Sequence, residues 1–415
     1  MQKILQISFK PILKSHTNIR LPLSKSESHR GIAILYLLSE LQAIKEIEWS
    51  DSTDTQLFLN FILSESEVFN FEDAGTPLRF ALAIQSINPE FRTITGNLRL
   101  QQRPIGDLLD ALKLMGAEIK FLENENKIPL RIKGPVNPPN IIEISGKESS
   151  QHVSAIMILI ATKFNWPLLK IKGELVSPSY VNLTIDSLKK FGIDSVEWQE
   201  GYTFHRPEVL RTDEFKVHGD WSAAGYCYLL QLMLPQIRIS LSNLDEDSAQ
   251  GDVITWRLFE KLGVETMFLE GDAYLRNTQK SQLLFDEDFH SNPDLVPTFV
   301  SACAYLDIEG IFRNIEILRN KESDRIASLN KNLHQLGFEL KEIEPGTYKL
   351  VKTKSKKLPF IIQTENDHRI AMAFAPWTVP LENISIDNPN CVSKSFPKFW
   401  EEIEKCGIVT NLLTP

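Results

Sequence analysis

The chain has 415 residues, of which 42% are hydrophobic and 24% are charged, the composition of an ordinary globular protein. Its formal net charge of −9 excludes the overall basic field by which many nucleic-acid-binding proteins attract their partner. The longest apolar runs, such as AIMILIA at 155–161, are far shorter than the ~18 residues of a membrane-spanning helix. At ~100–200 residues per domain, the length predicts two or more domains.

Six segments along the chain begin with small or polar residues and continue as an apolar, helix-forming stretch. In chain order they are SKSESHRGIAILYLL from Ser24, AGTPLRFALAI from Ala74, SSQHVSAIMILIA from Ser149, GDWSAAGYCYLLQLML from Gly219, PDLVPTFVSACAYL from Pro293 and DHRIAMAFA from Asp367. Their first residues are separated by 50, 75, 70, 74 and 74 residues. Each pattern predicts a buried helix with a polar N-terminus.

A second series of segments lies between the first. The segments are GDLLDALKLMGAEI, IDSLKKFGID, VITWRLFEKLGVE and DRIASLNKNLHQLGFEL, and their glycines are Gly116, Gly192, Gly263 and Gly337. Each pattern predicts an amphipathic helix that ends at a glycine in the left-handed conformation. Short β-like runs at 130–134, 168–173 and 237–244 occupy part of the intervening sequence.

The regular spacing indicates six repeated units of roughly 70 residues, each with one buried helix, one amphipathic helix and several strands. Units of this length are too long for a common solenoid, and six of them fit two domains of three units each. The alternative is that an α/β protein without repeats has helices at similar intervals by chance.

The starts of the apolar segments, and some loops between them, are rich in cations and hydroxyls. A helix N-terminus carries free N–H groups and a partial positive charge, so several such starts together predict an anion-binding site. Two carboxylates, Asp294 and Glu322, could transfer protons beside such anions. The cationic, hydroxyl and small residues at these positions are Lys25, Ser26, Arg30, Gly75, Thr76, Arg79, Arg103, Ser149, Ser150, Gln151, Ser177, Tyr180, Lys321, Arg325, Arg369 and Lys394.

Each of these residues also has a purely structural interpretation. Ser149 and Ser150 are ordinary N-cap residues, and Arg103 could be a solvated turn arginine. KESDR, at 321–325, could be an exposed helical ladder of salt bridges in which Lys321 and Arg325 lie one turn apart. The functional interpretation depends on the fact that these groups fall at matching positions of the repeat.

The order of the motifs resembles that of a known family. Ten short motifs follow one another over roughly residues 20 to 400. In chain order they are SKSESHR, AGTPLR, RPIGDLLDAL, SSQ, SPSY, GDWSAA, NPD, KESDR, NDHR and SKSFP. Together they resemble the 5-enolpyruvylshikimate-3-phosphate synthase family of enolpyruvyl transferases. The resemblance implies a two-domain α/β fold with three βαβαββ repeats per domain around buried helices. Residues 23–218 would form the domain that binds shikimate 3-phosphate, and residues 1–22 with 219–415 the domain with the phosphoenolpyruvate-binding and catalytic groups.

The resemblance also implies a reaction. The enolpyruvyl group of phosphoenolpyruvate would move to the 5-hydroxyl of shikimate 3-phosphate, phosphate would leave, and neither a metal nor an organic cofactor would take part. This is a transferase reaction of the shikimate pathway to chorismate and the aromatic amino acids, and the herbicide glyphosate would compete with phosphoenolpyruvate. We expect small-molecule substrates, no nucleic-acid or membrane partner, and a monomer.

The site residues carried over from the family fall into three groups. The catalytic residues would be Asp294 as the base, with Glu322 or Lys25 as the proton donor. Shikimate 3-phosphate would be bound by Lys25, Ser26, Arg30, Ser149, Ser150, Gln151, Ser177, Asp294 and Lys321. Phosphoenolpyruvate would be bound by Lys25, Gly75, Arg103, Gln151, Arg325, Arg369 and Lys394, with Arg325 and Arg369 on its carboxylate.

Four residues depart from the family pattern. Asp73 stands where the family often has Asn, and Pro77 follows Thr76 in the loop expected to bind phosphate. His218 replaces a commonly acidic residue, and Ile317 replaces a polar one. None of them removes a charged group assigned to catalysis, so they concern substrate affinity and the response to glyphosate.

The four cysteines are Cys227, Cys303, Cys391 and Cys406, without zinc-type or Cys-x-x-Cys spacing. They favour reduced thiols, and the N-terminal MQKILQISFK lacks the apolar core of a signal peptide, so we expect a cytoplasmic location. One alternative function is enolpyruvyl transfer to UDP-N-acetylglucosamine, whose enzymes typically carry a reactive cysteine, or an aspartate in its place, in the domain that contains Arg103. The first cysteine here is Cys227, outside that domain. The other alternative is a non-catalytic anion-binding repeat protein, which would leave Asp294 and Glu322 without a role.

Overall fold

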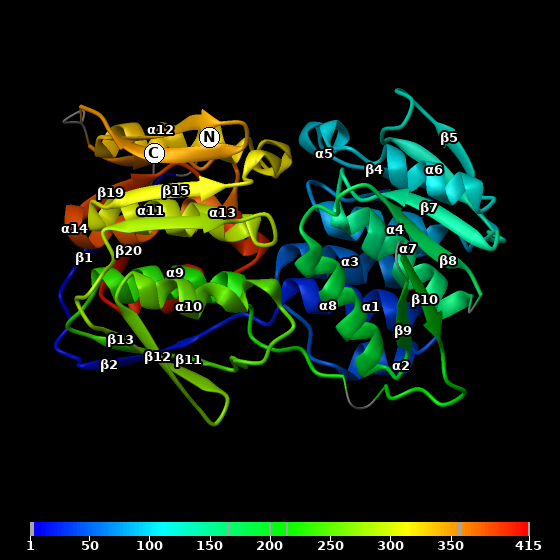
Figure 1. The fold of residues 1–415 in the computed structure, drawn as a ribbon, viewed down its shortest axis with the longest axis horizontal. Helices are drawn as coiled ribbons and strands as arrows, with labels where there is room; N and C mark the ends of the chain where they lie inside the picture. Colours follow the sequence, from blue (N-terminus) through cyan, green and yellow to red (C-terminus); the bar gives the residue numbers. More distant parts are fainter. Residues whose placement is uncertain (1–3, 165, 199–200, 213–214, 355–358, 414–415) are drawn as a thin grey trace. The chain divides into compact units, whose positions relative to one another are not determined.

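The computed structural model describes residues 4–164, 166–198, 201–212, 215–354 and 359–413. The chain divides into two compact units (Figure 1). We call Ser24–Ser50 with Asp54–Val217 the N-unit, and Met1–Leu23 with Asp51–Thr53 and His218–Pro415 the C-unit. Within the described ranges, no helix combines the length and the apolar character needed to cross a membrane.

The N-unit contains eight described helices and two described four-stranded sheets. The helices are α1 (Lys25–Leu37), α2 (Leu41–Glu46), α3 (Thr53–Leu63), α4 (Gly75–Gln85), α5 (Leu98–Gln102), α6 (Gly106–Leu114), α7 (Ser150–Lys163) and α8 (Pro178–Lys190). One sheet has the order β3-β4-β6-β5, with β3 (Val68–Asn70), β4 (Arg92–Thr95), β5 (Glu118–Phe121) and β6 (Leu130–Lys133). The other has the order β7-β8-β10-β9, with β7 (Ile141–Ser145), β8 (Leu168–Lys172), β9 (Asp194–Trp198) and β10 (Gly201–His205).

The C-unit contains three sheets among its described residues. Their orders are β18-β19-β1-β20, β12-β13-β11-β2 and β14-β15-β17-β16. The strands are β1 (Ile4–Phe9), β2 (His16–Arg20), β11 (Arg238–Ser242), β12 (Val264–Leu269), β13 (Asp272–Asn277), β14 (Leu284–Asp288), β15 (Glu309–Arg313), β16 (Phe338–Glu344), β17 (Thr347–Lys352), β18 (Ile361–Ile362), β19 (Asn383–Ile386) and β20 (Ile408–Leu413).

The α-helices of the C-unit are α9 (Trp221–Met233), α10 (Thr255–Lys261), α11 (Val296–Leu306), α12 (Arg325–Leu336), α13 (His368–Phe374), α14 (Thr378–Leu381) and α15 (Phe399–Glu404). Five short 3-10 helices, η1 to η5, are Gly251–Ile254, Pro293–Leu295, Glu316–Asn320, Ala375–Trp377 and Pro389–Lys394. Helices α9 and α10 lie over the sheet that contains β11, β12 and β13 (Figure 1). Helix α9 also packs against α11 and α13, so the C-unit has a helical interior.

The predicted βαβαββ unit is present. It occurs once in the N-unit, where the order is β7, α7, β8, α8, β9 and β10. It occurs again in the C-unit, where the order is β14, α11, β15, α12, β16 and β17. In both sheets the first two strands are parallel and the others antiparallel. The N-terminal strands complete two sheets of the C-unit, because β2 pairs with β11 and β1 lies between β19 and β20.

The described part of the N-unit has two four-stranded sheets rather than the three that three full repeats would give. The reason is local, since Lys25 to Leu63 forms the helices α1, α2 and α3 and contributes no strand. The C-unit has the three predicted sheets among its described residues, and the prediction of an α/β fold built from repeated sheet and helix units is confirmed.

Both predicted helix series are also confirmed. The six apolar segments form α1, α4, α7, α9, α11 and α13, and every residue of α13 is buried. The four glycines that follow the amphipathic helices all have positive φ, from 83° at Gly192 to 106° at Gly116. A left-handed residue closes the last helical turn with little strain when it is glycine.

Candidate active site

Helix α13 begins with a charged cluster although its residues are buried. Asp367, which is 0% exposed, is the N-cap residue, and its carboxylate accepts a hydrogen bond from the backbone N–H of Arg369 at 3.0 Å. The same carboxylate accepts from the Ser323 hydroxyl at 3.0 Å and from Nε of Arg325 at 2.8 Å. Asp367 therefore joins the start of α13 to the start of α12.

Arg325 is the centre of this cluster, and its side chain is 1% exposed. Besides Asp367, its guanidinium donates to Oδ1 of Asp294 and to Oε2 of Glu322, each at 2.7 Å. Burial lowers the pKa of Arg325, but the three carboxylates outweigh burial and raise it. A buried charge is tolerated where it is paired and hydrogen-bonded in this way.

Asp294 connects Arg325 to two further cations. Its Oδ2 accepts from Nη2 of Arg369 at 2.9 Å, and its Oδ1 lies 3.8 Å from Nζ of Lys321. Burial raises the pKa of Asp294, but Arg369, Lys321 and Arg325 outweigh it and hold the pKa well below its usual value. Asp294 is therefore an ionised carboxylate.

The cluster joins five residues that the sequence predicted as site residues, namely Asp294, Lys321, Glu322, Arg325 and Arg369. The segment KESDR is not helical as one interpretation expected. Asp324 is the N-cap of α12 and accepts from the N–H of Ala327 at 3.1 Å, so the helix begins only at Arg325. Lys394, 5% exposed, ends η5, which packs against α13.

Four residues beside this cluster were missed by the sequence prediction. Tyr226 on α9 has its hydroxyl 3.5 Å from Nη1 of Arg369, and burial raises its pKa. The buried Asp252 accepts hydrogen bonds from Ser222 and, at 3.3 Å, from Asn292. Burial raises the pKa of Asp252 to about 6. Ser222 and Asn292 belong to the motifs GDWSAA and NPD, whereas no local pattern singles out Asp252 or Tyr226.

In the N-unit, Arg30 connects three helices. Its side chain donates to Thr184 Oγ1 at 2.8 Å and to the carbonyl of Tyr180 at 2.8 Å on α8, and to Ser154 Oγ on α7 at 3.3 Å. On its own helix, α1, it donates to the carbonyl of Ser26 at 3.0 Å. Arg30 therefore fixes the starts of α1 and α8 relative to α7, and its predicted contact with shikimate stays a prediction.

Lys25, the first residue of α1, forms a salt bridge with Asp54 at 3.0 Å. Both side chains are largely buried, with 14% and 8% exposed. The pairing places the predicted catalytic lysine next to a carboxylate.

Gly75 and Arg103, two residues predicted to bind phosphoenolpyruvate, lie against each other. A Cβ added at Gly75 would lie 2.7 Å from Cζ of Arg103, closer than real Cβ contacts come. Arg79 supports this arrangement, because it donates to the carbonyl of Gly75 at 2.9 Å and to that of Pro104 at 2.7 Å. These contacts agree with the structural interpretation of Arg79.

The start of α7 contains three of the predicted residues. Ser149 is the N-cap and accepts from the N–H of Gln151 at 3.2 Å, and Ser150 is the first helical residue. The amide oxygen Oε1 of Gln151 is buried and has no hydrogen-bond partner within the described part of the chain. Ser177, the residue before α8, has φ 52° and ψ 59°, a left-handed conformation that is rare for a residue other than glycine.

Solved structures with a similar fold define the class of protein. EPSP synthase from Acinetobacter baumannii aligns with a TM-score of 0.70 at 20% identity and covers 99% of this chain and 100% of its own. The enolpyruvyl transferase NikO from Streptomyces tendae also aligns with a TM-score of 0.70, at 12% identity, and both chains are covered completely. At these identities the likeness concerns the fold, which is that of the enolpyruvyl transferases.

Sequence comparison identifies the family within this class. The model of the family EPSP synthase (3-phosphoshikimate 1-carboxyvinyltransferase) matches residues 10–403. A 3-phosphoshikimate 1-carboxyvinyltransferase from Bacteroides fragilis is 37% identical over 392 residues, which cover 94% of this chain and 95% of the relative. One from Vibrio campbellii is 28% identical over 426 residues, covering 96% and 98%. The chain belongs to the EPSP synthase family.

This membership confirms the predicted activity, that of an enzyme of the shikimate pathway that transfers the enolpyruvyl group of phosphoenolpyruvate to shikimate 3-phosphate. The matching relatives bear the name of the shikimate enzyme, so the alternative acceptor UDP-N-acetylglucosamine has no support. A non-catalytic repeat protein is likewise not supported.

Proposed function

We propose that this chain performs the family reaction with the residues predicted from its motifs, divided between the two units. The N-unit residues would bind the phosphate of shikimate 3-phosphate through Ser149, Ser150 and Ser177. The support is the start of α7, where the half-buried Ser149 and the buried Ser150 lie at the positive end of the helix dipole. Ser26, Arg30, Gln151, Asp294 and Lys321 would contact the ring and its hydroxyls.

The phosphate of phosphoenolpyruvate would be bound by Lys25, Arg103 and Lys394, with Gly75 leaving room for it and Gln151 beside it. The close approach of the Arg103 guanidinium to Gly75 supports this assignment, since a Cβ at this position would force the guanidinium to move. Arg325 and Arg369 would bind the carboxylate of phosphoenolpyruvate, because a planar guanidinium matches the two oxygens of a carboxylate.

The observation that best supports this chemistry is the pairing of Arg325 and Arg369 with Asp294. A substrate carboxylate that binds these two arginines competes with Asp294 for their positive charge. The pKa of Asp294 then rises from its low value, because the same cations hold it down. Asp294 would therefore become a better base once phosphoenolpyruvate is bound, and it would accept the proton of the attacking 5-hydroxyl.

Glu322 or Lys25 would protonate the methylene carbon. Glu322 accepts a hydrogen bond from Arg325, and Lys25 is paired with Asp54, so each side chain is held in one position. The tetrahedral intermediate would then expel phosphate, with the cations stabilising the leaving group. No metal or organic cofactor enters these steps.

The wider assignments follow from the same predictions. The protein would act in the cytoplasm as a monomer, without a nucleic-acid or membrane partner. Residues 23–218 would form the shikimate-3-phosphate domain, and residues 1–22 with 219–415 the domain with the catalytic groups.

The experiment that tests the assignment compares ligand affinities of two variants. Ser177→Ala should weaken shikimate 3-phosphate, and Arg325→Ala should mainly weaken phosphoenolpyruvate, each by the ~1.5–3 kcal/mol of a hydrogen bond to a charged group. Separate titrations of the two substrates measure both effects. Equal weakening of both substrates by each variant would contradict the division into two anion subsites.

A further inference from the structure

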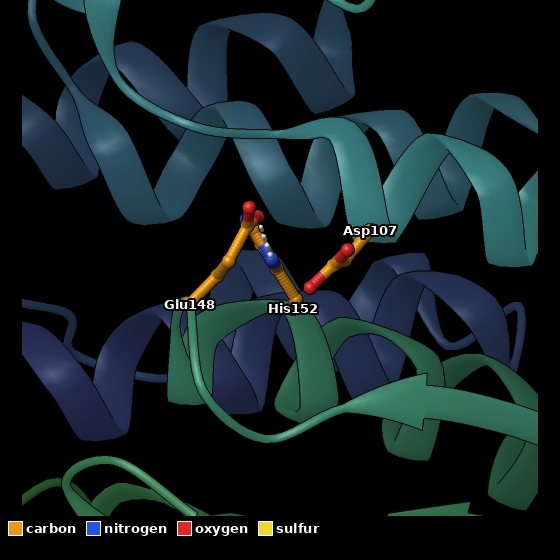
Figure 2. A group of neighbouring side chains, drawn as sticks. All are labelled: Asp107, Glu148 and His152. Atoms are coloured by element: carbon orange, nitrogen blue, oxygen red, sulfur yellow. Dashed lines mark ion pairs between the residues drawn. The ribbon is translucent and has the colours of Figure 1, made fainter. Parts of the chain in front are cut away.

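A second polar cluster lies in the N-unit and is not used by the proposed reaction. It consists of Asp107 in the first turn of α6, Glu148 in the turn before α7 and His152 in the first turn of α7 (Figure 2). One ligand atom from each residue lies within 4.8 Å of the others. Figure 2 shows the Glu148 carboxylate and the His152 ring directed toward each other, with the Asp107 carboxylate beside them.

The orientation of His152 directs its unprotonated ring nitrogen, Nδ1, toward the carboxylates. Its Nε2 lies 3.2 Å from the carbonyl oxygen of Pro104, which only accepts hydrogen bonds, so Nε2 carries the proton. In the neutral imidazole with its proton on Nε2, Nδ1 has a free lone pair. The side chain is 0% exposed, and Nδ1 has no hydrogen-bond partner among the described residues.

Glu148 presents a second unsatisfied acceptor to the same point. Its Oε2 is buried without a hydrogen-bond partner in the described ranges and lies 3.9 Å from Nδ1 of His152. These two buried acceptors are costly without a donor, and a cation between them and the Asp107 carboxylate would satisfy both.

We propose that Asp107, Glu148 and His152 bind one divalent metal ion of the zinc class, through Nδ1 of the histidine and one oxygen of each carboxylate. A neutral imidazole with two carboxylates is a ligand set of mixed nitrogen and oxygen donors that suits zinc and its transition-metal neighbours. The two carboxylates balance the charge of the ion. Three protein ligands leave a fourth position for water.

The geometry allows the ion to enter with a small movement. Zinc binds nitrogen and oxygen ligands at roughly 2.0–2.2 Å, so ligand atoms up to 4.8 Å apart must draw together by about an ångström. Glu148, whose side chain is 40% exposed, is free to make that movement, whereas His152 is held in place by Pro104. The ion would then join the turn before Ser149 to the first turn of α6, and it would take no part in the transfer itself.

The test measures zinc binding to the full chain after treatment with a chelator. Equilibrium dialysis and calorimetric titration with ZnCl₂ should give one high-affinity site in the wild-type chain. Glu148→Gln and Asp107→Asn should weaken binding by at least about 10-fold, since loss of even an outer-shell partner costs 10–100-fold. The matched control is Asp110→Asn, which removes an acidic charge three residues from Asp107 on the exposed side of α6, where Asp110 pairs with Lys113.

A spectroscopic measurement separates this site from adventitious binding to the cysteine thiols. Cobalt bound in place of zinc should show no thiolate charge-transfer absorption, and the cobalt spectrum should change in His152→Gln. Circular dichroism checks that His152→Gln is folded. If it is not, Glu148→Gln and Asp107→Asn decide the question. Absence of stoichiometric binding by the wild-type chain, or equal affinity of the Glu148 and Asp110 variants, would overturn the proposal.

Discussion

Arg325 pairs with three carboxylates in the C-unit. It donates to Asp294, Glu322 and Asp367, while Arg369 and Lys321 add further positive charge around Asp294. Removing one partner of such a cluster leaves an uncompensated buried charge, which costs ~3–5 kcal/mol. The substrate titrations of Arg325→Ala therefore need a check that this variant is folded, whereas a variant that keeps the shape of the side chain, such as Glu322→Gln, avoids most of this loss of stability.

The first prediction concerns Glu322→Gln, which keeps the shape of the side chain but cannot transfer the proton in the same way. We expect kcat to fall at least ~10²-fold, within the range of general acid–base catalysis, with a much smaller change in substrate binding. Steady-state rates of phosphate release at varied substrate concentrations measure kcat and the change in substrate binding. The control is Glu316→Gln, which removes an exposed carboxylate that holds Arg319 at 2.7 Å outside the cluster. A near wild-type kcat would reduce Glu322 to a charge-pairing residue.

The second prediction concerns Gly75→Ala, which adds a methyl group where Arg103 leaves no room. The arginine must shift, so we expect a higher KM for phosphoenolpyruvate and a larger loss of inhibition by glyphosate. Gly106→Ala is the control, because a Cβ there meets nothing closer than 3.9 Å. Inhibition kinetics at varied phosphoenolpyruvate measure both effects. An unchanged inhibition constant in Gly75→Ala would place Arg103 and the inhibitor in different subsites.

At the scale of elements, local chemistry explains which features could be predicted from the sequence. The starts of α7 at Ser149 and of α13 at Asp367 were predictable because capping depends on residues within one turn. The partners of Arg325 and Arg30 were not, because they come from packing between distant elements. Asp294 lies 31 residues from Arg325 and 75 from Arg369, and Thr184 lies 154 from Arg30. Asp252 was missed for the same reason.

The third prediction concerns the left-handed conformation of Ser177 before α8. Ser177→Ala and Ser177→Gly both remove the hydroxyl, so both should weaken shikimate 3-phosphate to a similar extent. Glycine adopts positive φ without strain and alanine does not. The free energy of unfolding should therefore be about 1 kcal/mol higher for Ser177→Gly than for Ser177→Ala. Urea denaturation measures it, and equal stabilities would show that this backbone is not strained.

The fourth prediction concerns the packing of α1 on α3 through His29. His29 is buried, lies 3.1 Å from the hydroxyl of Thr55, and faces Asp54, Lys25 and Arg30. Burial is the main cause that lowers its pKa from 6.5 to about 3, so it is neutral in the folded protein. In the unfolded chain His29 takes up a proton below pH 6.5. The contribution of neutral His29 to the free energy of unfolding is therefore complete above pH 6.5 and is lost as the pH falls toward 3.

Between these values His29 should lower the free energy of unfolding by up to about 1.4 kcal/mol per pH unit. Denaturant titrations between pH 7 and pH 4 should show a shallower loss for His29→Gln than for wild type. His205→Gln, on the exposed part of β10, is the control. An identical pH dependence of His29→Gln and wild type would mean that His29 does not contribute to acid destabilisation.

At the scale of the whole molecule, the repeated sheet and helix units account for the position of the proposed site residues. Buried helices α1, α4 and α7 each begin with a residue assigned to substrate binding or catalysis, Asp294 lies two residues before α11, and Arg369 is the second residue of α13. Their N-termini supply partial positive charge, which explains how a chain with a net charge of −9 can bind two anionic substrates. The composition of the whole chain could not predict this, because the relevant charge is local.

The central claim is that these anion-binding helix starts serve enolpyruvyl transfer to shikimate 3-phosphate. It is tested most directly by the rate of phosphate release from phosphoenolpyruvate with each acceptor in turn. We predict release with shikimate 3-phosphate and none with UDP-N-acetylglucosamine, with the shikimate-dependent rate reduced at least ~10²-fold in Glu322→Gln. Release with UDP-N-acetylglucosamine but not with shikimate 3-phosphate would contradict the account.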